Sequence, residues 1–181
     1  LSPNATHLTW WDGTAETWWA QSVAPGSRAV DLGQAIDAPL YNEQHDRPYP
    51  PFPYGAAGWT EGDEAFVIYD QFDAWAVDPA SPDTPTNITG GQGRAEAVRF
   101  RVQPLDREAD ALDPDAPLML RDFHTETMAS GYYRGTMEGE APTPLIMMDR
   151  RFSGLMQATD SDRLLYQREN VREFPNLWTA T

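Results

Sequence analysis

The stretch GWTEGDEAFVIYDQFDAWAVDPASPDTPTNIT, Gly58–Thr89, alternates short β-forming runs with turn residues. A first run, Ala65–Tyr69, ends at Asp70. A second run, Ala74–Val77, follows, and a loop rich in Pro, Ser and Asp leads to a third at Asn87–Thr89. Short runs of β-formers separated by Gly, Pro, Asp and Asn predict an antiparallel meander.

The same order of elements recurs along the chain. In each copy an acidic or Ser/Pro turn precedes a β-rich run, an acid closes that run, and a second run follows. The other copies begin at His7, Leu118 and Leu164. A period of roughly 45 to 58 residues is typical of propeller blades. The sequence therefore predicts an all-β fold of antiparallel four-stranded blades, a partial β-propeller of about four blades with incomplete terminal ones.

The 181 residues are predicted to form a single partial β-propeller domain. Its blade-like units are expected at about 1–36, 56–94, 95–148 and 149–181. Five prolines in 37–55 disfavour regular structure, so this segment is predicted to be an irregular connection draped over one face. No long segment has helical periodicity, and helix should be scarce. A start at Leu-Ser-Pro inside a repeat indicates part of a longer protein.

Side-chain alternation predicts which residues of the strands face inward. Four tryptophans fall in two facing runs, so two should point into the core and two outward: Trp10, Trp11, Trp18 and Trp19. In the run Ala97–Gln103, apolar residues alternate with Arg and Gln, which predicts a half-buried strand.

Composition limits the class of protein. Hydrophobic residues make up 40% and aromatic residues 12%, enough for a core, and no apolar run reaches 18 residues. The absence of Cys excludes a disulfide, a thiol nucleophile and a thiolate metal site.

The net charge is −15, from 28 acidic residues and 13 basic ones, all of them Arg. Such a surface repels phosphates and anionic lipids, so neither nucleic acid nor membrane is expected as a partner. Dense carboxylate without Lys also fits a halophilic source, where salt screens the repulsion. The alternative explanation is a GC-rich genome that encodes Arg in place of Lys.

Few residues are candidates for binding. His45 with Asp46 could form a metal or acid/base pair, but an exposed loop histidine is the commoner case. Gly90–Arg94 is glycine-rich, yet phosphate-binding fingerprints need a helix after the glycines. A β-type run follows here, so a turn between blades is predicted. His124, beside Asp122 and Glu126, is interpreted as a solvated residue at a strand end.

The segment 104–117 has the acid spacing of a calcium loop but lacks its central Gly and terminal Glu. It is therefore interpreted as an acidic turn with these acids: Asp106, Glu108, Asp110, Asp113 and Asp115.

Catalytic motifs are missing from the sequence. No Gly-x-Ser-x-Gly exists, since the Ser-Gly pairs at Ser130 and Ser153 lack the first glycine. Three scattered histidines do not make a hydrolytic metal site. A carboxylate pair for glycoside hydrolysis stays open, although no spacing singles one out. We therefore assign no catalytic, cofactor-binding or metal-binding residue, and no cofactor.

Two stretches resemble the β-propeller region of prolyl oligopeptidase family serine peptidases, especially bacterial dipeptidyl-aminopeptidase/acylaminoacyl-peptidase-like members. They are YDQFDAWAVDP…TNITGGQGR at Tyr69–Arg94 and LLYQRENVREFPNLW at Leu164–Trp178. The chain departs from the family pattern at Ala74, where Ile is usual, and at Asn176, where Asp is usual. Some of its turns are shared with other propellers, including TolB-like ones.

The resemblance implies a non-catalytic segment of a larger peptidase. The family's catalytic residues lie in an α/β-hydrolase domain that none of these residues belongs to, so no catalytic residue is carried over. The propeller would filter peptide substrates by size and act as a lid for that domain. A bacterial periplasmic or secreted location is favoured over the cytoplasm. Alternatives are a TolB-like scaffold that binds protein or carbohydrate, and an acidic glycoside-binding or glycoside-cleaving β-domain.

An open arc of blades leaves unpaired strand edges, which favour pairing between copies. We therefore also expect a homo-oligomer through the open blade edges.

Overall fold

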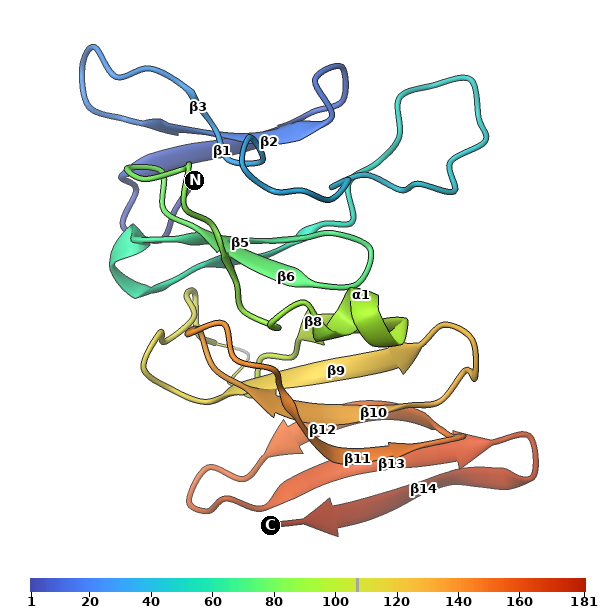
Figure 1. Ribbon diagram of the computed structural model, residues 1–181. Coiled ribbons are helices and arrows are strands. Elements are labelled where there is room, and N and C mark those ends of the chain that lie inside the picture. The colour runs from blue at the N-terminus through green and yellow to red at the C-terminus, as the bar shows by residue number, and fades with distance from the viewer. Residues whose placement is uncertain (107) are drawn as a thin grey trace.

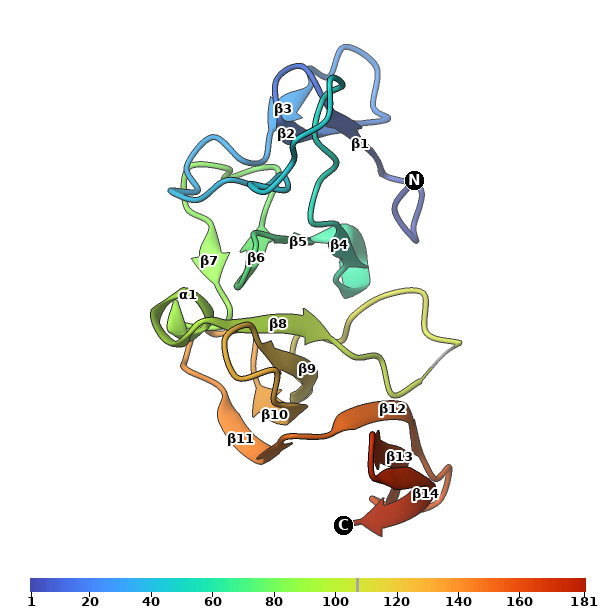
Figure 2. The same ribbon diagram turned by 90° about the vertical axis from the view of Figure 1, so that its right-hand side faces the viewer.

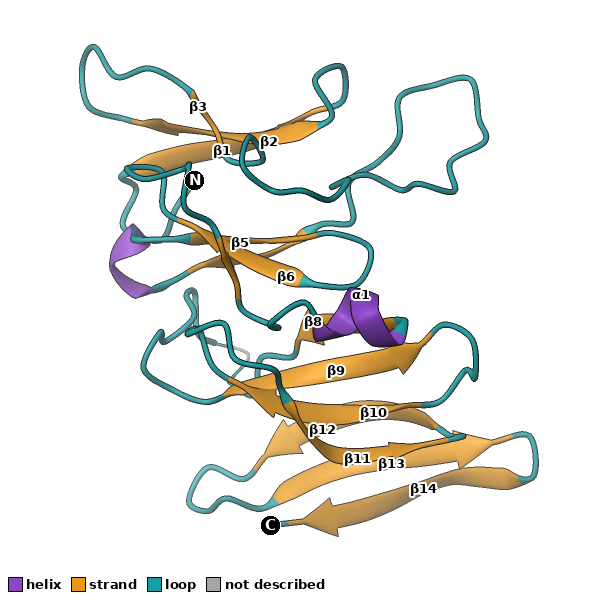
Figure 3. Cartoon of the chain, in the orientation of Figure 1, coloured by secondary structure: helices purple, strands orange, loops and turns teal. Residues whose placement is uncertain are grey.

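The computed structural model describes residues 1–106 and 108–181, which form four antiparallel β-sheets stacked in chain order (Figures 1 and 3). The predicted all-β class is confirmed. The view turned by 90° keeps this order, with the N-terminus beside the first sheet and the C-terminus on the fourth (Figure 2).

Each sheet is a meander in which neighbours along the chain are also neighbours in the sheet. The first contains β1 (His7–Asp12), β2 (Thr17–Ser22) and β3 (Val30–Asp31). The second contains β4 (Ala56–Trp59), β5 (Phe66–Tyr69), β6 (Ala74–Val77) and β7 (Thr86–Asn87). The third contains β8 (Val98–Val102), β9 (Leu118–His124), β10 (Ser130–Gly135) and β11 (Thr143–Met148). The fourth contains β12 (Arg151–Gln157), β13 (Leu164–Asn170) and β14 (Glu173–Ala180).

Helix is scarce, as predicted, but it appears where the sequence indicated only a turn. A single 3₁₀ turn, η1 (Glu61–Asp63), joins β4 to β5, and a short helix, α1 (Gln92–Glu96), precedes β8. The prediction of a simple turn at Gly90–Arg94 is therefore wrong from Gln92 onward. Gly90 and Gly91 have positive φ, and the chain then coils once before it enters the third sheet.

Three apolar layers hold the stack together, one between each pair of successive sheets. The first layer includes Leu32 and Ile68, the second Val67 and Phe100, and the third Tyr132 and Phe152. Because every internal sheet contributes one face to each of two layers, its central strands are buried on both sides. The four fully buried residues of β5, FVIY, illustrate this.

The tryptophan prediction is confirmed. Trp11 and Trp18 meet edge to face and pack against the first layer. Trp10 and Trp19 are directly opposite each other on the other side of the same strands and stack with ring centroids 6.5 Å apart. Cross-strand pairing thus places one aromatic pair on each side of the sheet.

The half-buried strand predicted at Ala97–Gln103 is β8, but its arginine side is covered as well. Arg101 lies over the Tyr69 ring at 4.4 Å and donates to the carbonyl oxygens of Asp70 and Gln71. Burial is the main reason why the pKa of Arg101 falls to about 10. The guanidinium remains charged at neutral pH and ties β8 to the end of β5.

The proline-rich connection, 37–55, folds back on itself and carries an isolated bridge between Tyr41 and Pro53. Leu40 enters the first apolar layer, while Tyr54 packs against the second. The loop is irregular, as predicted, and is anchored at both ends.

The N-terminal segment is fastened to η1 by Asp63. Its carboxylate accepts hydrogen bonds from the hydroxyls of Ser2 and Thr6, both at 2.6 Å, and from the backbone N–H of Asn4. This contact ties the first repeat to the entry of the second sheet.

Candidate functional site on the fourth sheet

His45 and His124, considered above as candidate site residues, each make their hydrogen bonds within their own loop or hairpin. The Nε2 atom of His45 lies 2.7 Å from the Tyr49 carbonyl oxygen of its own loop, and its ring packs on the Tyr49 ring. The Nδ1 atom of His124 accepts the backbone N–H groups of Glu126 and Thr127, which closes the β9–β10 hairpin. His45 makes no side-chain pair with Asp46 in the structure as described.

The acidic segment 104–117, of which all but residue 107 is described, forms local turns. Asp106 accepts the N–H of Glu108, and Asp113 accepts the N–H of Asp115. Within 1–106 and 108–181, no group of three or more His, Asp or Glu residues is placed to hold a metal ion.

The two serines that precede glycine make structural contacts. Ser130 donates its hydroxyl to the Arg150 carbonyl oxygen at 2.7 Å. Ser153 lies 3.5 Å from the Gln167 side-chain oxygen. Neither hydroxyl is hydrogen-bonded to a histidine in the described structure, so no nucleophile–base pair is assembled there.

The Tyr69–Arg94 motif forms a compact hydrogen-bonded node around two buried aspartates. Asp70 accepts the backbone N–H groups of Phe72 and Asp73 and the indole N–H of Trp75. The Arg94 guanidinium lies 3.3 Å from the same carboxylate.

Asp73 binds backbone N–H groups of the glycine-rich stretch 90–94. Its carboxylate accepts the Thr89 hydroxyl at 2.6 Å and the backbone N–H groups of Gly93 and Arg94 at 2.9 and 3.0 Å. Burial raises the pKa of Asp73 above its ordinary value, although these hydrogen bonds oppose the shift. Two N–H groups of this stretch, those of Gly93 and Arg94, are therefore occupied by a side chain of the protein itself.

The fourth sheet carries a different kind of feature, an arginine–glutamate cluster at one end of its strands. Glu173 accepts Arg150 Nε at 2.8 Å and Arg168 Nη2 at 3.0 Å. The Arg168 guanidinium also lies 3.8 Å from the centre of the Trp178 ring. Hydrogen bonds from Arg168 and then Arg150 lower the pKa of Glu173, so it stays ionised.

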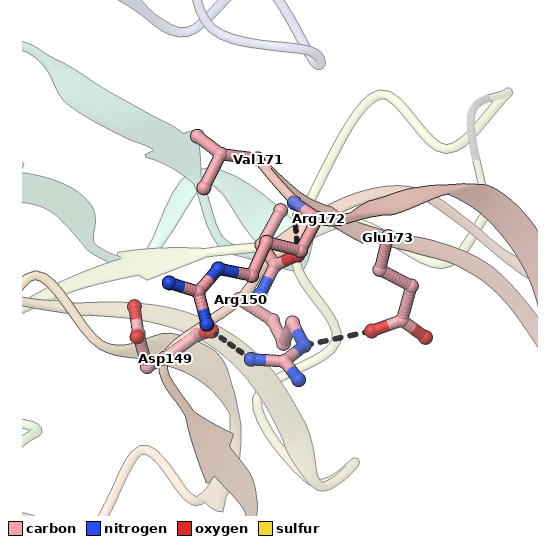
Figure 4. Close-up of a pocket in the computed structure, with 6 residues that line it drawn as sticks. Asp149, Arg150, Val171, Arg172 and Glu173 are labelled. Atoms are coloured by element: carbon pink, nitrogen blue, oxygen red, sulfur yellow. Dashed lines mark hydrogen bonds and ion pairs between the residues drawn. The ribbon is translucent and has the colours of Figure 1, made fainter.

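A cleft of about 500 Å³ opens beside this cluster, between the β11–β12 and β13–β14 turns (Figure 4). It is lined by Asp149, Arg150 and the turn Asn170–Glu173. Arg150 donates to the Asp149 carbonyl oxygen at 2.6 Å, which holds its guanidinium across the cleft floor.

The side of the fourth sheet that faces away from the third carries apolar side chains among polar ones, which include the Arg151–Glu169 ion pair. Met156 and Leu165 are cross-strand partners, and Leu177 is 66% exposed. Leu165 lies between Leu164 and Tyr166, which pack toward the third sheet, so strand alternation turns it outward. We call Met156, Leu165 and Leu177 the outer face of the fourth sheet.

Charge is distributed unevenly around this face. Residues 149–181 contain five arginines and five acids, so they are electrically neutral, whereas the preceding 148 residues carry the whole net charge of −15. From Phe174 to Thr181 there is no charged residue. An electrically neutral sheet with exposed apolar side chains, in a strongly acidic chain, is a candidate interface.

The opposite end of the stack has a similar face. Leu8, Trp10 and Trp19 lie on the side of β1 and β2 that faces away from the second sheet, and Leu8 is 49% exposed. We call these three residues the outer face of the first sheet.

Sequence reasoning predicted two outward tryptophans of the first sheet, but it did not single out the outer face of the fourth sheet or the Arg150–Glu173–Arg168 cluster. The alternation in the end strands was visible, but a sequence does not say which face has a neighbouring sheet. The fall in net charge after residue 148 was the available signal.

No helix among the described residues is long and apolar enough to cross a membrane. No protein-family model, curated protein sequence or solved structure matches this chain.

Proposed function

We propose that the chain forms consecutive blades of a β-propeller that is the non-catalytic part of a larger prolyl oligopeptidase family serine peptidase. Four successive antiparallel meanders, joined face to face by apolar layers, support this proposal. The Asp70–Asp73 node supports it too, because it gives a physical role to the motif at Tyr69–Arg94 that resembles the family.

The observation that carries the proposal is the pair of apolar outer faces. In a closed ring every sheet has a neighbour on both sides, and no such face would remain exposed. Trp10 and Trp19 at one end and Met156, Leu165 and Leu177 at the other are what a ring would cover with further blades. Exposed or half-buried apolar side chains at both ends of the stack support further blades as their cover.

In the proposed role, the propeller encloses and covers the active-site chamber of the hydrolase domain. The propeller would limit the size of peptides that reach an α/β-hydrolase domain and would keep water out of its chamber. The partners are that domain and its peptide substrates.

The native protein provides the test. An antibody against these 181 residues would enrich it from the source organism, and a fluorophosphonate would label any active serine hydrolase in the captured polypeptide. We expect a labelled polypeptide in which a Gly-x-Ser-x-Gly sequence follows the propeller. It should cleave short peptides and leave folded proteins intact.

An unlabelled polypeptide without such a sequence would overturn the peptidase proposal and favour a TolB-like scaffold. Hydrolysis or binding of glycans by the chain itself would instead support an acidic glycoside-binding or glycoside-cleaving domain.

A further inference from the structure

Asp122 is a carboxylic acid enclosed within the third sheet. It lies on β9, is 1% exposed, and has Phe100 of β8 and Gly131 of β10 as cross-strand neighbours. Neither carboxyl oxygen has a hydrogen-bond partner in the part of the chain that the structure describes. Burial of an ionised carboxylate without donors is strongly unfavourable.

Comparison with Asp70 shows why Asp122 lacks partners. Both acids follow a β-rich run of the repeat, but Asp70 ends its strand, so the turn that follows presents N–H groups to its carboxylate. β9 continues past Asp122 to His124. The backbone around Asp122 is consequently committed to pairing with neighbouring strands, and no turn N–H is free to bind it.

The side chain of Asp122 lies at the junction of the second and third sheets. Strand alternation puts it on the same face as Leu118 and Leu120. Those two residues pack in the apolar layer that also contains Tyr69 and Ile88 of the second sheet. This layer joins the first half of the stack to the second.

The surroundings favour the neutral acid. Burial raises the pKa of Asp122 to about 7, and the residue's own backbone N–H and then the adjacent Arg121 oppose the shift only in part. The titratable and charged groups on the elements around it are Arg121 and His124 on β9, Arg99 and Arg101 on β8, Tyr132, Tyr133 and Arg134 on β10, Arg94 and Glu96 on α1, and Tyr69 on β5. Arg101 is already bonded to Asp70 and Gln71 and is not a counter-ion for Asp122.

We propose that Asp122 is a proton-controlled switch at the junction of the second and third sheets, which pack firmly when its carboxyl is protonated and loosen when it ionises. The neutral group can occupy the apolar layer, whereas the charged group draws water toward it. This regulation does not depend on the peptidase proposal, because it concerns the described sheets alone.

The direction of the pH effect follows from the two states. The unfolded chain releases this proton near pH 3.8, and the folded chain holds it until about pH 7. The folded form is thus favoured at low pH, and this advantage is lost as pH rises between those values. Relative to a variant without the acid, the unfolding equilibrium constant should rise by up to about tenfold per pH unit in this window.

The experiment compares the wild-type chain with Asp122→Asn, which keeps the size of the side chain and removes its ionisation. Asp115→Asn is the matched control, because Asp115 is exposed in a turn. Carbon-13 NMR of the labelled aspartate carboxyls would locate the Asp122 midpoint. Hydrogen exchange of the β5, β8 and β9 amides at pH 5.5 and 8, corrected for intrinsic rates, would report the junction.

We expect an Asp122 midpoint near neutrality and faster exchange at pH 8 in the wild type and in Asp115→Asn, with no such change in Asp122→Asn. A midpoint near 4 would overturn the proposal, and so would an exchange response that survives Asp122→Asn. If Asp122→Asn does not fold, the wild-type NMR titration decides alone.

Discussion

Asp73 shows how one buried side chain can join two sheets. It belongs to the turn before β6, yet its carboxylate binds Thr89 after β7 and the first N–H groups of α1, which leads into β8. Glycine is required at position 93, because a Cβ there would lie 2.6 Å from the Asp73 carboxylate and 2.8 Å from the Val98 carbonyl oxygen. The connection between the second and third sheets depends on this close approach.

We predict that Asp73→Ala destabilises the chain by about 3 kcal/mol, because it removes the acceptor of the Gly93 and Arg94 N–H groups and one of the two acceptors of the Thr89 hydroxyl. Urea unfolding followed by tryptophan fluorescence would measure the change. Asp115→Ala, at an exposed turn, should change stability little. Equal effects of the two substitutions would contradict a special role for Asp73.

The ionisation of Asp63 should affect the stability of the fold in the opposite direction to that of Asp122 as pH changes. Burial alone would raise the pKa of Asp63, but hydrogen bonds from Ser2, Thr6 and Asn4 outweigh it and lower the pKa to about 2. The stabilisation from this carboxylate is therefore complete above about pH 4 and is lost as pH falls through about 2. Asp63→Asn should be less stable than the wild type at pH 6, and the difference should shrink toward pH 2. Denaturant titrations across this range would check it, and parallel curves would refute it.

At the scale of elements, β10 and β11 approach unusually closely at Gly131. A Cβ on residue 131 would overlap the Ile146 carbonyl oxygen and lie 2.7 Å from its carbonyl carbon. Since these are backbone atoms, only movement of the strand could relieve the clash. The absence of a side chain therefore sets the spacing of the third sheet.

Gly131→Ala should destabilise the chain by about 2–3 kcal/mol, in the range for overpacking of a buried site. Thermal unfolding would measure the effect. Gly13→Ala is the control, because a Cβ there would come only to 3.3 Å of the Pro50 Cβ. A stability loss at Gly131 no larger than at Gly13 would contradict the close approach.

β8 shows how far the alternation of apolar and polar residues in a strand predicts burial. β8 has the predicted pattern, and Val98 and Phe100 are buried as expected. Its arginines were expected on the open side, yet Arg101 is held under Tyr69 and the end of β5. Alternation predicts which residues share a face, but the neighbouring sheet determines whether that face is exposed.

At the scale of the molecule, the net charge of −15 makes stability depend on salt. Screening lengths fall from about 10 Å at 0.1 M salt to about 3 Å at 1 M, so repulsion between carboxylates weakens. If the source is halophilic, the midpoint of thermal unfolding should rise from low salt to 2 M KCl. A variant with the exposed acids of 106–115 changed to Asn or Gln should gain less. No gain for the wild type would argue for genome composition instead.

Because β14 has an unpaired edge, we predict that the isolated chain self-associates. β14 is the outermost strand of its sheet, and Leu177 and Phe174 are exposed on it. After Glu173 and Pro175 at its start, the strand has no charge or proline that would block pairing with a second β14. Light scattering after size exclusion should show dimers or larger species at high concentration. Leu177→Lys should restore the monomer, whereas Val171→Lys in the neighbouring turn should not. A strict monomer in the wild type would contradict this prediction.

The sequence by itself determined the strands and their grouping into meanders. Turn residues and β-forming runs act over a few positions, so the runs from His7, Ala65, Leu118 and Leu164 could be located without knowledge of the fold. The inward and outward tryptophans followed from the same local rule, because successive side chains of a strand point to opposite sides.

Only the tertiary structure decided which residues pack against each face of a sheet. The partners of Asp73, the isolation of Asp122 and the cover over Arg101 all depend on segments that are distant in the sequence or on the length of a strand. The two outer faces are exposed because no further sheet lies against them in the described structure. A strand's pattern depends on its own residues, but burial and pKa depend on the atoms that pack across from it.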